Sequence, residues 1–199
     1  MEVMTPRKLE AGSFVRTANG HFVGGDLAIV RSHEEFLFLA LVDVLGHGPQ
    51  AYSTALELEE VILGWNDKFD ILALMKALHE HQKQGRGAVI SLCTIESMTG
   101  DVRYVGIGNA TCRTMGEHPH HLLTREGVVG HTLRTPSVER LNLDQHDILL
   151  LYSDGVSSHF EIEEPCQLFF DPLDNVARRV VETFGRSHDD ASCIAVRYT

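Results

Sequence analysis

The chain has 199 residues with a formal net charge of −11, and 43% of its residues are hydrophobic against 23% that are charged. These values are typical of a globular protein with a sizeable core, and we expect residues 1–199 to form a single domain. The acidic balance argues against a nucleic-acid-binding protein, because phosphate backbones require a basic surface.

Two further features bear on location. The most apolar stretch, residues 36–44, is too short to span a bilayer and contains an aspartate, so we expect no membrane partner. The four cysteines include no Cys-x-x-Cys pair, which favours reduced core residues over a disulfide or zinc framework. The sequence therefore predicts a cytoplasmic protein.

The first half of the chain predicts strands followed by a pair of helices. Short strands are expected over 13–18 and 27–31, and the continuous apolar run over 36–43 is typical of a buried central strand. A Gly-His-Gly breaker and a proline then begin a helix over 49–63. A second amphipathic helix begins near Asp70, which is a favourable N-cap residue.

The second half is mainly strands. The apolar patterns predict strands over 88–95, 102–107, 110–115, 147–152 and 191–198, with one helix over 172–184. This order lacks the regular strand–helix alternation of a parallel α/β fold. It predicts an α+β fold of mainly antiparallel sheets with helices on the outer faces.

Four aspartates lie at the edges of these apolar runs: Asp26, Asp43, Asp154 and Asp189. Each alone is explained equally well as a turn residue. Carboxylates that converge repel one another unless a cation holds them, and an all-oxygen ligand set favours Mg²⁺ or Mn²⁺. A pair of such ions can activate water against a phosphate ester.

The ordered motifs resemble those of a known family. They are Gly24-Gly25-Asp26, the segment from Asp43 to Gly48, the segment from Val105 to Ala110, Ser153-Asp154-Gly155, and Asp189-Asp190-Ala191-Ser192. Together they resemble the metal-dependent PPM (type 2C) serine/threonine phosphatases, and most closely their SpoIIE-like branch. Over residues 13–198 this resemblance implies an αββα sandwich of two mainly antiparallel sheets flanked by helices, with a centre of two Mn²⁺ or Mg²⁺ ions.

The resemblance also implies individual roles. Asp43 is similar to the carboxylate that bridges both metals, and the carbonyl of Val44 to the backbone ligand that follows it. Asp154 and Asp189 are similar to ligands of the first ion. Asp26 is similar to a second-metal or water-mediated carboxylate.

Other positions depart from the family or leave alternatives open. Leu45 stands where many eukaryotic members have a histidine proposed as general acid. His47 follows two positions later, and it either protonates the leaving oxygen or is a loop residue. Arg86 either docks phosphate or is a solvated loop residue. Asp190 either contributes to the metal site or forms the turn.

The function implied by the resemblance is a protein phosphatase that uses metal-activated water. In its minimal size the chain resembles the stressosome phosphatases, whose substrates are phosphoserine and phosphothreonine on STAS-domain proteins. One alternative is a phosphatase of a phosphorylated anti-anti-sigma factor that a separate partner activates. A second alternative is a non-catalytic regulatory protein with the same fold, which the four repelling carboxylates disfavour.

Overall fold

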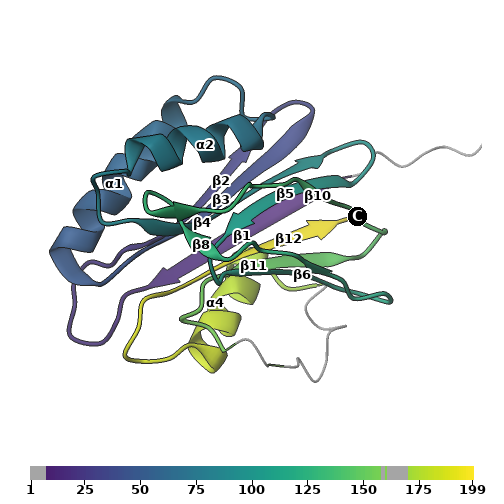
Figure 1. The fold of residues 1–199 in the computed structure, drawn as a ribbon. Coiled ribbons are helices and arrows are strands. Elements are labelled where there is room, and N and C mark those ends of the chain that lie inside the picture. Colours follow the sequence, from purple (N-terminus) through teal and green to yellow (C-terminus); the bar gives the residue numbers. More distant parts are fainter. Residues whose placement is uncertain (1–7, 158–159, 161–169) are drawn as a thin grey trace, which may run out of the picture.

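The computed structural model describes residues 8–157, 160 and 170–199, and in it two five-stranded sheets pack face to face between helices (Figure 1). All the pairings within these sheets are antiparallel. The α+β fold with an αββα arrangement, which the sequence predicted, is therefore confirmed.

Both sheets draw strands from distant parts of the chain. The first sheet has the order β1 (Leu9–Arg16), β12 (Ala191–Tyr198), β11 (Ile148–Tyr152), β6 (Thr111–Met115) and β7 (His121–Leu122). The second has the order β10 (Glu139–Asn142), β5 (Asp101–Ile107), β4 (Ala88–Glu96), β3 (Phe36–Val44) and β2 (Asp26–Ser32). The small hairpin of β8 (Gly127–Val128) and β9 (Thr132–Leu133) forms a separate two-stranded sheet, which contacts β4 through a bridge between Val129 and Ala88.

In the part of the chain that the structure describes, three helices cover the outer faces. Helices α1 (Gly48–Gly64) and α2 (Ile71–His81) pack on the second sheet, and α4 (Leu173–Phe184) packs on the first (Figure 1). Asp70 caps α2 as predicted, since its side chain accepts a hydrogen bond from the Ala73 amide at 3.0 Å. Among the described residues, no helix is both long and apolar enough to cross a lipid bilayer.

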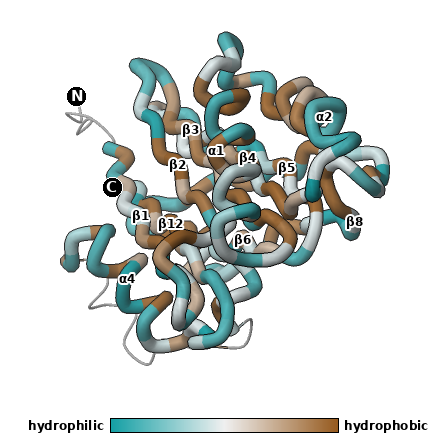
Figure 2. Tube along the Cα trace, turned by 90° about the vertical axis from the view of Figure 1, so that its left-hand side faces the viewer, coloured by the Kyte–Doolittle hydropathy of each residue, from teal (hydrophilic) through white to brown (hydrophobic). Residues whose placement is uncertain are grey.

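The alternating pattern of β12 explains how one strand serves two apolar layers. Ile194 and Val196 point into the core between the sheets, whereas Cys193 and Ala195 pack against α4. Figure 2 shows that α4 carries both hydrophobic and hydrophilic positions, as expected of a helix with one buried face. Cys93, Cys112 and Cys193 are buried free thiols, and Cys166 lies outside the described residues.

The structure differs from the sequence prediction in the start of β1 and in four short strands. Strand β1 begins earlier than residue 13, because it pairs with β12 along its whole length, from Leu9 opposite Tyr198 to Arg16 opposite Ala191. The short strands β7 to β10, between residues 121 and 142, were not predicted. They contain two to four residues each and have no buried apolar run that would mark them.

Candidate metal centre

The four aspartates come together at one end of the sandwich, as the sequence analysis expected. Asp26 and Asp43 are directly paired at the end of β2 and β3, while Asp154 follows β11 and Asp189 precedes β12. The pKa of Asp43 rises to about 9, first because of burial, then because of the charges of Asp26 and Asp154 and a hydrogen bond with Asp154. The charge of Asp189 raises it further. Carboxylates associated with both sheets are therefore close enough to affect one another's pKa.

Asp26 is the most buried of the four, with 5% of its surface exposed. Its Oδ2 accepts hydrogen bonds from the hydroxyls of Ser153 and Ser192, each at 2.7 Å, and the Ser192 amide donates to the Ser153 hydroxyl at 3.0 Å. Burial raises the pKa of Asp26 to about 7, against the lowering effect of the two hydroxyls. Because Asp26 belongs to the second sheet and both serines to the first, these bonds join the two sheets beneath the site.

Asp154 is oriented by a residue from the end of β5. The side-chain amide of Asn109 donates to Oδ2 of Asp154 at 2.6 Å. Asn109 belongs to a motif that supported the family resemblance, but its role was missed. The signal was an asparagine after two glycines at the end of an apolar strand, at the same end of the sheet as the aspartates.

Asp190 does something more specific than forming a turn. Its two carboxylate oxygens accept hydrogen bonds from the backbone amides of Ala18 and Gly25, each at 2.7 Å. A side chain at Gly24 would collide with this carboxylate, since a Cβ there would lie 2.5 Å from it. Asp190 therefore fixes the loop that leads into Asp26.

His47 lies beside a second imidazole that the sequence analysis did not single out. The rings of His21 and His47 have centroids 4.6 Å apart and are tilted by 44°. His47 is exposed immediately before α1, and His21 lies in a turn whose carbonyl accepts a hydrogen bond from the Thr17 hydroxyl at 3.0 Å. Two loops that are distant in sequence thus place imidazoles side by side.

Arg86 contacts the segment after Asp43. Its Nη1 donates to the carbonyl of Leu45 at 3.2 Å and its Nη2 to the side-chain oxygen of Gln50 at 2.5 Å. Arg86 therefore bonds to protein groups rather than to solvent alone, and docking of phosphate by this residue stays a prediction.

The donor set fits a hard cation with a water-rich shell. Within residues 8–157, 160 and 170–199, no group of three or more His, Cys, Asp or Glu side chains is placed to hold a metal by itself. Mg²⁺ does not need such a group, because it usually keeps several waters and binds protein through one or two carboxylates. Burial first, and then the charges of neighbouring carboxylates, raise the pKa values of Asp26 and Asp43, and a divalent cation would offset both effects.

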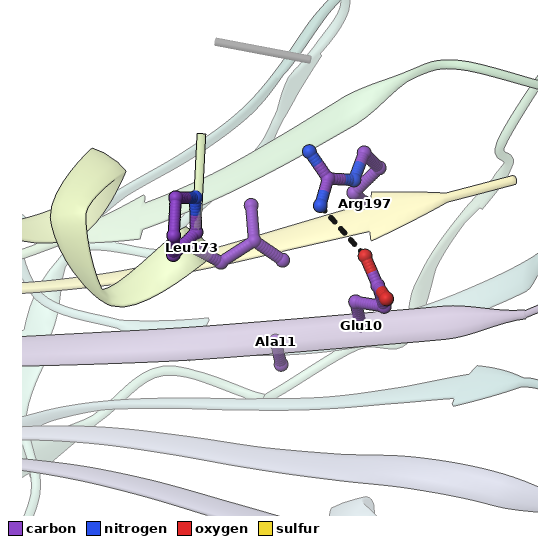
Figure 3. Close-up of a pocket in the computed structure, with 5 residues that line it drawn as sticks. Glu10, Ala11, Leu173 and Arg197 are labelled. Carbon is purple, nitrogen blue, oxygen red and sulfur yellow. Dashed lines mark hydrogen bonds and ion pairs between the residues drawn. The ribbon is translucent and has the colours of Figure 1, made fainter. Parts of the chain in front are cut away.

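A pocket on the surface lies away from the four aspartates. It has a volume of about 400 Å³ and lies where β1, β12 and the start of α4 meet, with an ion pair of 2.6 Å between Glu10 and Arg197 (Figure 3). Glu10 is at the far end of β1 from Arg16, and Arg16 pairs with the start of β12 that follows Asp189. The pocket is therefore at the opposite end of the sheet from the aspartates.

Comparison with known proteins identifies relatives of this arrangement. The family model for stage II sporulation protein E (SpoIIE) matches residues 33–199. No curated protein sequence matches the chain.

Solved structures reproduce the fold over nearly the whole chain. A chain from the bacterial stressosome, described as a modular system adapted to control secondary messenger signalling, is 24% identical with a TM-score of 0.86, over 96% of this chain and 100% of that one. RsbX in complex with magnesium is 15% identical with a TM-score of 0.81, over 96% of each chain. The PP2C phosphatase domain of SpoIIE from Bacillus subtilis is 18% identical with a TM-score of 0.72, over 96% of this chain and 63% of that one.

Proposed function

This chain belongs to the SpoIIE family, and on that premise we propose that it is a metal-dependent protein phosphatase acting on phosphoserine and phosphothreonine of STAS-domain stress-signalling proteins. The observation that carries the proposal is the convergence of Asp26, Asp43, Asp154 and Asp189 at one end of a PP2C-type sandwich. Retaining four mutually repelling carboxylates has a physical reason when cations are bound there.

In this proposal Asp43, the Val44 carbonyl, Asp154 and Asp189 would hold two Mn²⁺ or Mg²⁺ ions, and Asp26 would bind the second ion directly or through a water. The ions supply a water nucleophile at neutral pH and neutralise charge on the phosphoryl group.

Other side chains orient the metal-binding carboxylates, and one supplies the proton that the leaving oxygen needs. Asn109 holds the Asp154 carboxylate in one orientation, and the hydroxyls of Ser153 and Ser192 do the same for Asp26. In this proposal the exposed His47 donates a proton to the departing serine or threonine oxygen, because histidine is the side chain that most often acts as a general acid.

The substrate class is supported by the relatives rather than by the geometry of the aspartate cluster. Neighbours of similar size include a stressosome chain and RsbX, and each matches 96% of this chain. A folded phosphoprotein presents a surface larger than the carboxylate cluster, so we expect recognition to extend beyond the phosphorylated residue.

The test is a comparison of kcat/KM in the presence of Mn²⁺ for a folded phosphorylated STAS domain and for a peptide with the same phosphosite. We expect the folded domain to be preferred and Asp43→Asn to abolish turnover of both. Equal values for domain and peptide contradict the substrate class. Absence of any turnover, including that of p-nitrophenyl phosphate, contradicts the phosphatase itself and favours a regulatory binding protein.

A further inference from the structure

The segment Arg86–Gly87 holds Leu45 on both sides. The Arg86 guanidinium donates to the Leu45 carbonyl at 3.2 Å, and the Gly87 carbonyl accepts from the Leu45 amide at 3.1 Å. Both backbone polar groups of one loop residue are therefore satisfied by two consecutive residues of another segment. This residue lies two positions after Asp43.

The loop from Val44 to Gly48 needs an external constraint. Gly46 and Gly48 have φ angles of +90° and +75°, in a region that only glycine adopts readily, so the loop has high conformational freedom when unfolded. Its middle residues are exposed, and the residue at the N-cap of α1, His47, makes no side-chain capping bond. Val44 is held in β3 by its pairing with Ala88, and Gly48 begins α1, so the residues that depend on contacts with other segments are those at 45–47.

Arg86 supplies that constraint through its planar fork. Besides Leu45 it bonds to Gln50 in the first turn of α1, at 2.5 Å, so it connects the loop to the helix that follows. A Cβ at Gly46 would lie 2.9 Å from Nη1, which shows that the guanidinium packs directly against the loop backbone. A lysine has a single ammonium without this fork.

The backbone of Arg86 is held in place by contacts with the segment that contains β8 and β9. The ring nitrogen Nε2 of His131 lies 3.0 Å from the Arg86 carbonyl, and Ala88 exchanges backbone hydrogen bonds with Val129 at 2.8 and 3.1 Å. The arginine backbone is thus fixed between β4 and the β8–β9 hairpin. This rigidity lets the side chain act as a brace.

We infer that Arg86 is a positioning residue for the phosphatase reaction: it braces the Val44–Gly48 loop, so that the Val44 carbonyl and His47 keep their places beside Asp43. This inference rests on the proposed function. It assigns no contact between Arg86 and the substrate.

The experiment compares Arg86→Ala and Arg86→Lys with Arg134→Ala, which removes an exposed arginine that forms an ion pair with Glu126 at 3.6 Å. With p-nitrophenyl phosphate and saturating Mn²⁺, we expect kcat to fall about tenfold to a hundredfold in Arg86→Ala, as misplaced catalytic groups do. Arg86→Lys recovers little, and Arg134→Ala behaves as wild type. KM and inhibition by inorganic phosphate stay within about twofold, because substrate contacts are intact.

Two further readouts separate positioning from a general loss of structure. Hydrogen exchange is expected to accelerate in the peptide that covers residues 44–50 of Arg86→Ala and to remain unchanged in β3 and α2. Millimolar guanidinium is expected to restore part of kcat in Arg86→Ala, whereas tetramethylammonium does not.

The inference is overturned if Arg86→Ala retains wild-type kcat and loop protection. It is also overturned if KM and the phosphate inhibition constant rise while exchange is unchanged, since Arg86 then binds the substrate directly. If the wild-type protein hydrolyses nothing, the proposed function fails, and the exchange comparison still decides whether Arg86 holds the loop.

Discussion

Asp26 and Asp43 stand directly opposite each other on neighbouring antiparallel strands. Like charges at such positions destabilise a sheet, and here both carboxyl groups are also withdrawn from water. The pair therefore has an energetic cost in the metal-free protein that increases as the two groups ionise.

That cost predicts how the metal-free protein responds to pH. The pKa of Asp43 is higher in the folded than in the unfolded chain, so the folded state retains the proton longer. Its contribution to stability is full below about pH 4 and is lost progressively as pH rises toward the folded-state pKa, by at most ~1.4 kcal/mol per pH unit for each proton. Urea unfolding in EDTA at several pH values is expected to show a smaller decline in Asp43→Asn. Identical slopes in the two proteins contradict the raised pKa.

A second prediction concerns metal binding, measured apart from activity. Mn²⁺ or Mg²⁺ is expected to raise the Tm near neutral pH, and EDTA to reverse the rise, because the ions bind only the folded state. At about a hundredfold excess over Kd the gain is ~2.7 kcal/mol. Asp154→Asn and Asp189→Asn are expected to reduce the shift, whereas Asp174→Asn, on the far side of the first sheet, leaves it unchanged. An equal shift in all variants excludes these aspartates as ligands.

The role of His47 as general acid is tested by comparing substrates whose leaving groups differ in their need for a proton. His47→Ala is expected to slow hydrolysis of a phosphoserine substrate by about a hundredfold, because an alkoxide needs a proton to depart. An aryl phosphate, whose phenolate leaves unaided, slows far less. His81→Ala, in the last turn of α2, serves as the control. Equal losses on both substrates assign His47 to loop structure.

Asp190 is expected to matter for folding more than its neighbour Asp189. Asp190→Ala removes the acceptor of two short bonds and leaves the Ala18 and Gly25 amides without it, at a cost of about 3 kcal/mol. Urea unfolding with EDTA present measures this loss. A destabilisation no larger than that of Asp189→Ala contradicts the anchoring role.

The sequence predicted the parts of the site that lie on or next to regular elements. Asp43 is the penultimate residue of a nine-residue apolar strand, and Asp154 and Asp189 lie two residues from strands of the other sheet, so the apolar runs marked all three as residues at strand ends. Ser192 was missed as a partner of Asp26 because a serine at the start of a strand has no periodic signature. Its role exists only through a contact that spans 166 residues.

The same limit applies to Arg86 and to the segment from residue 121 to 142. An arginine between two glycines has the composition of a solvated loop, and only the folded chain shows that it reaches Leu45. Strands β7 to β10 are too short to show a period of two. Both features depend on tertiary contacts rather than on local pattern.

The position of β12 also governs when the molecule can assemble during synthesis. This strand lies between β1 and β11, and its residue Tyr198 pairs with Leu9. A nascent chain emerging from the ribosome therefore carries β1 without a partner until almost all of these residues have been made. Contacts of such long range form slowly, so a partly synthesised chain exposes apolar strand edges and lacks Asp189. The first sheet therefore becomes ordered at the same late stage at which Asp189, the last of the four site aspartates, is synthesised.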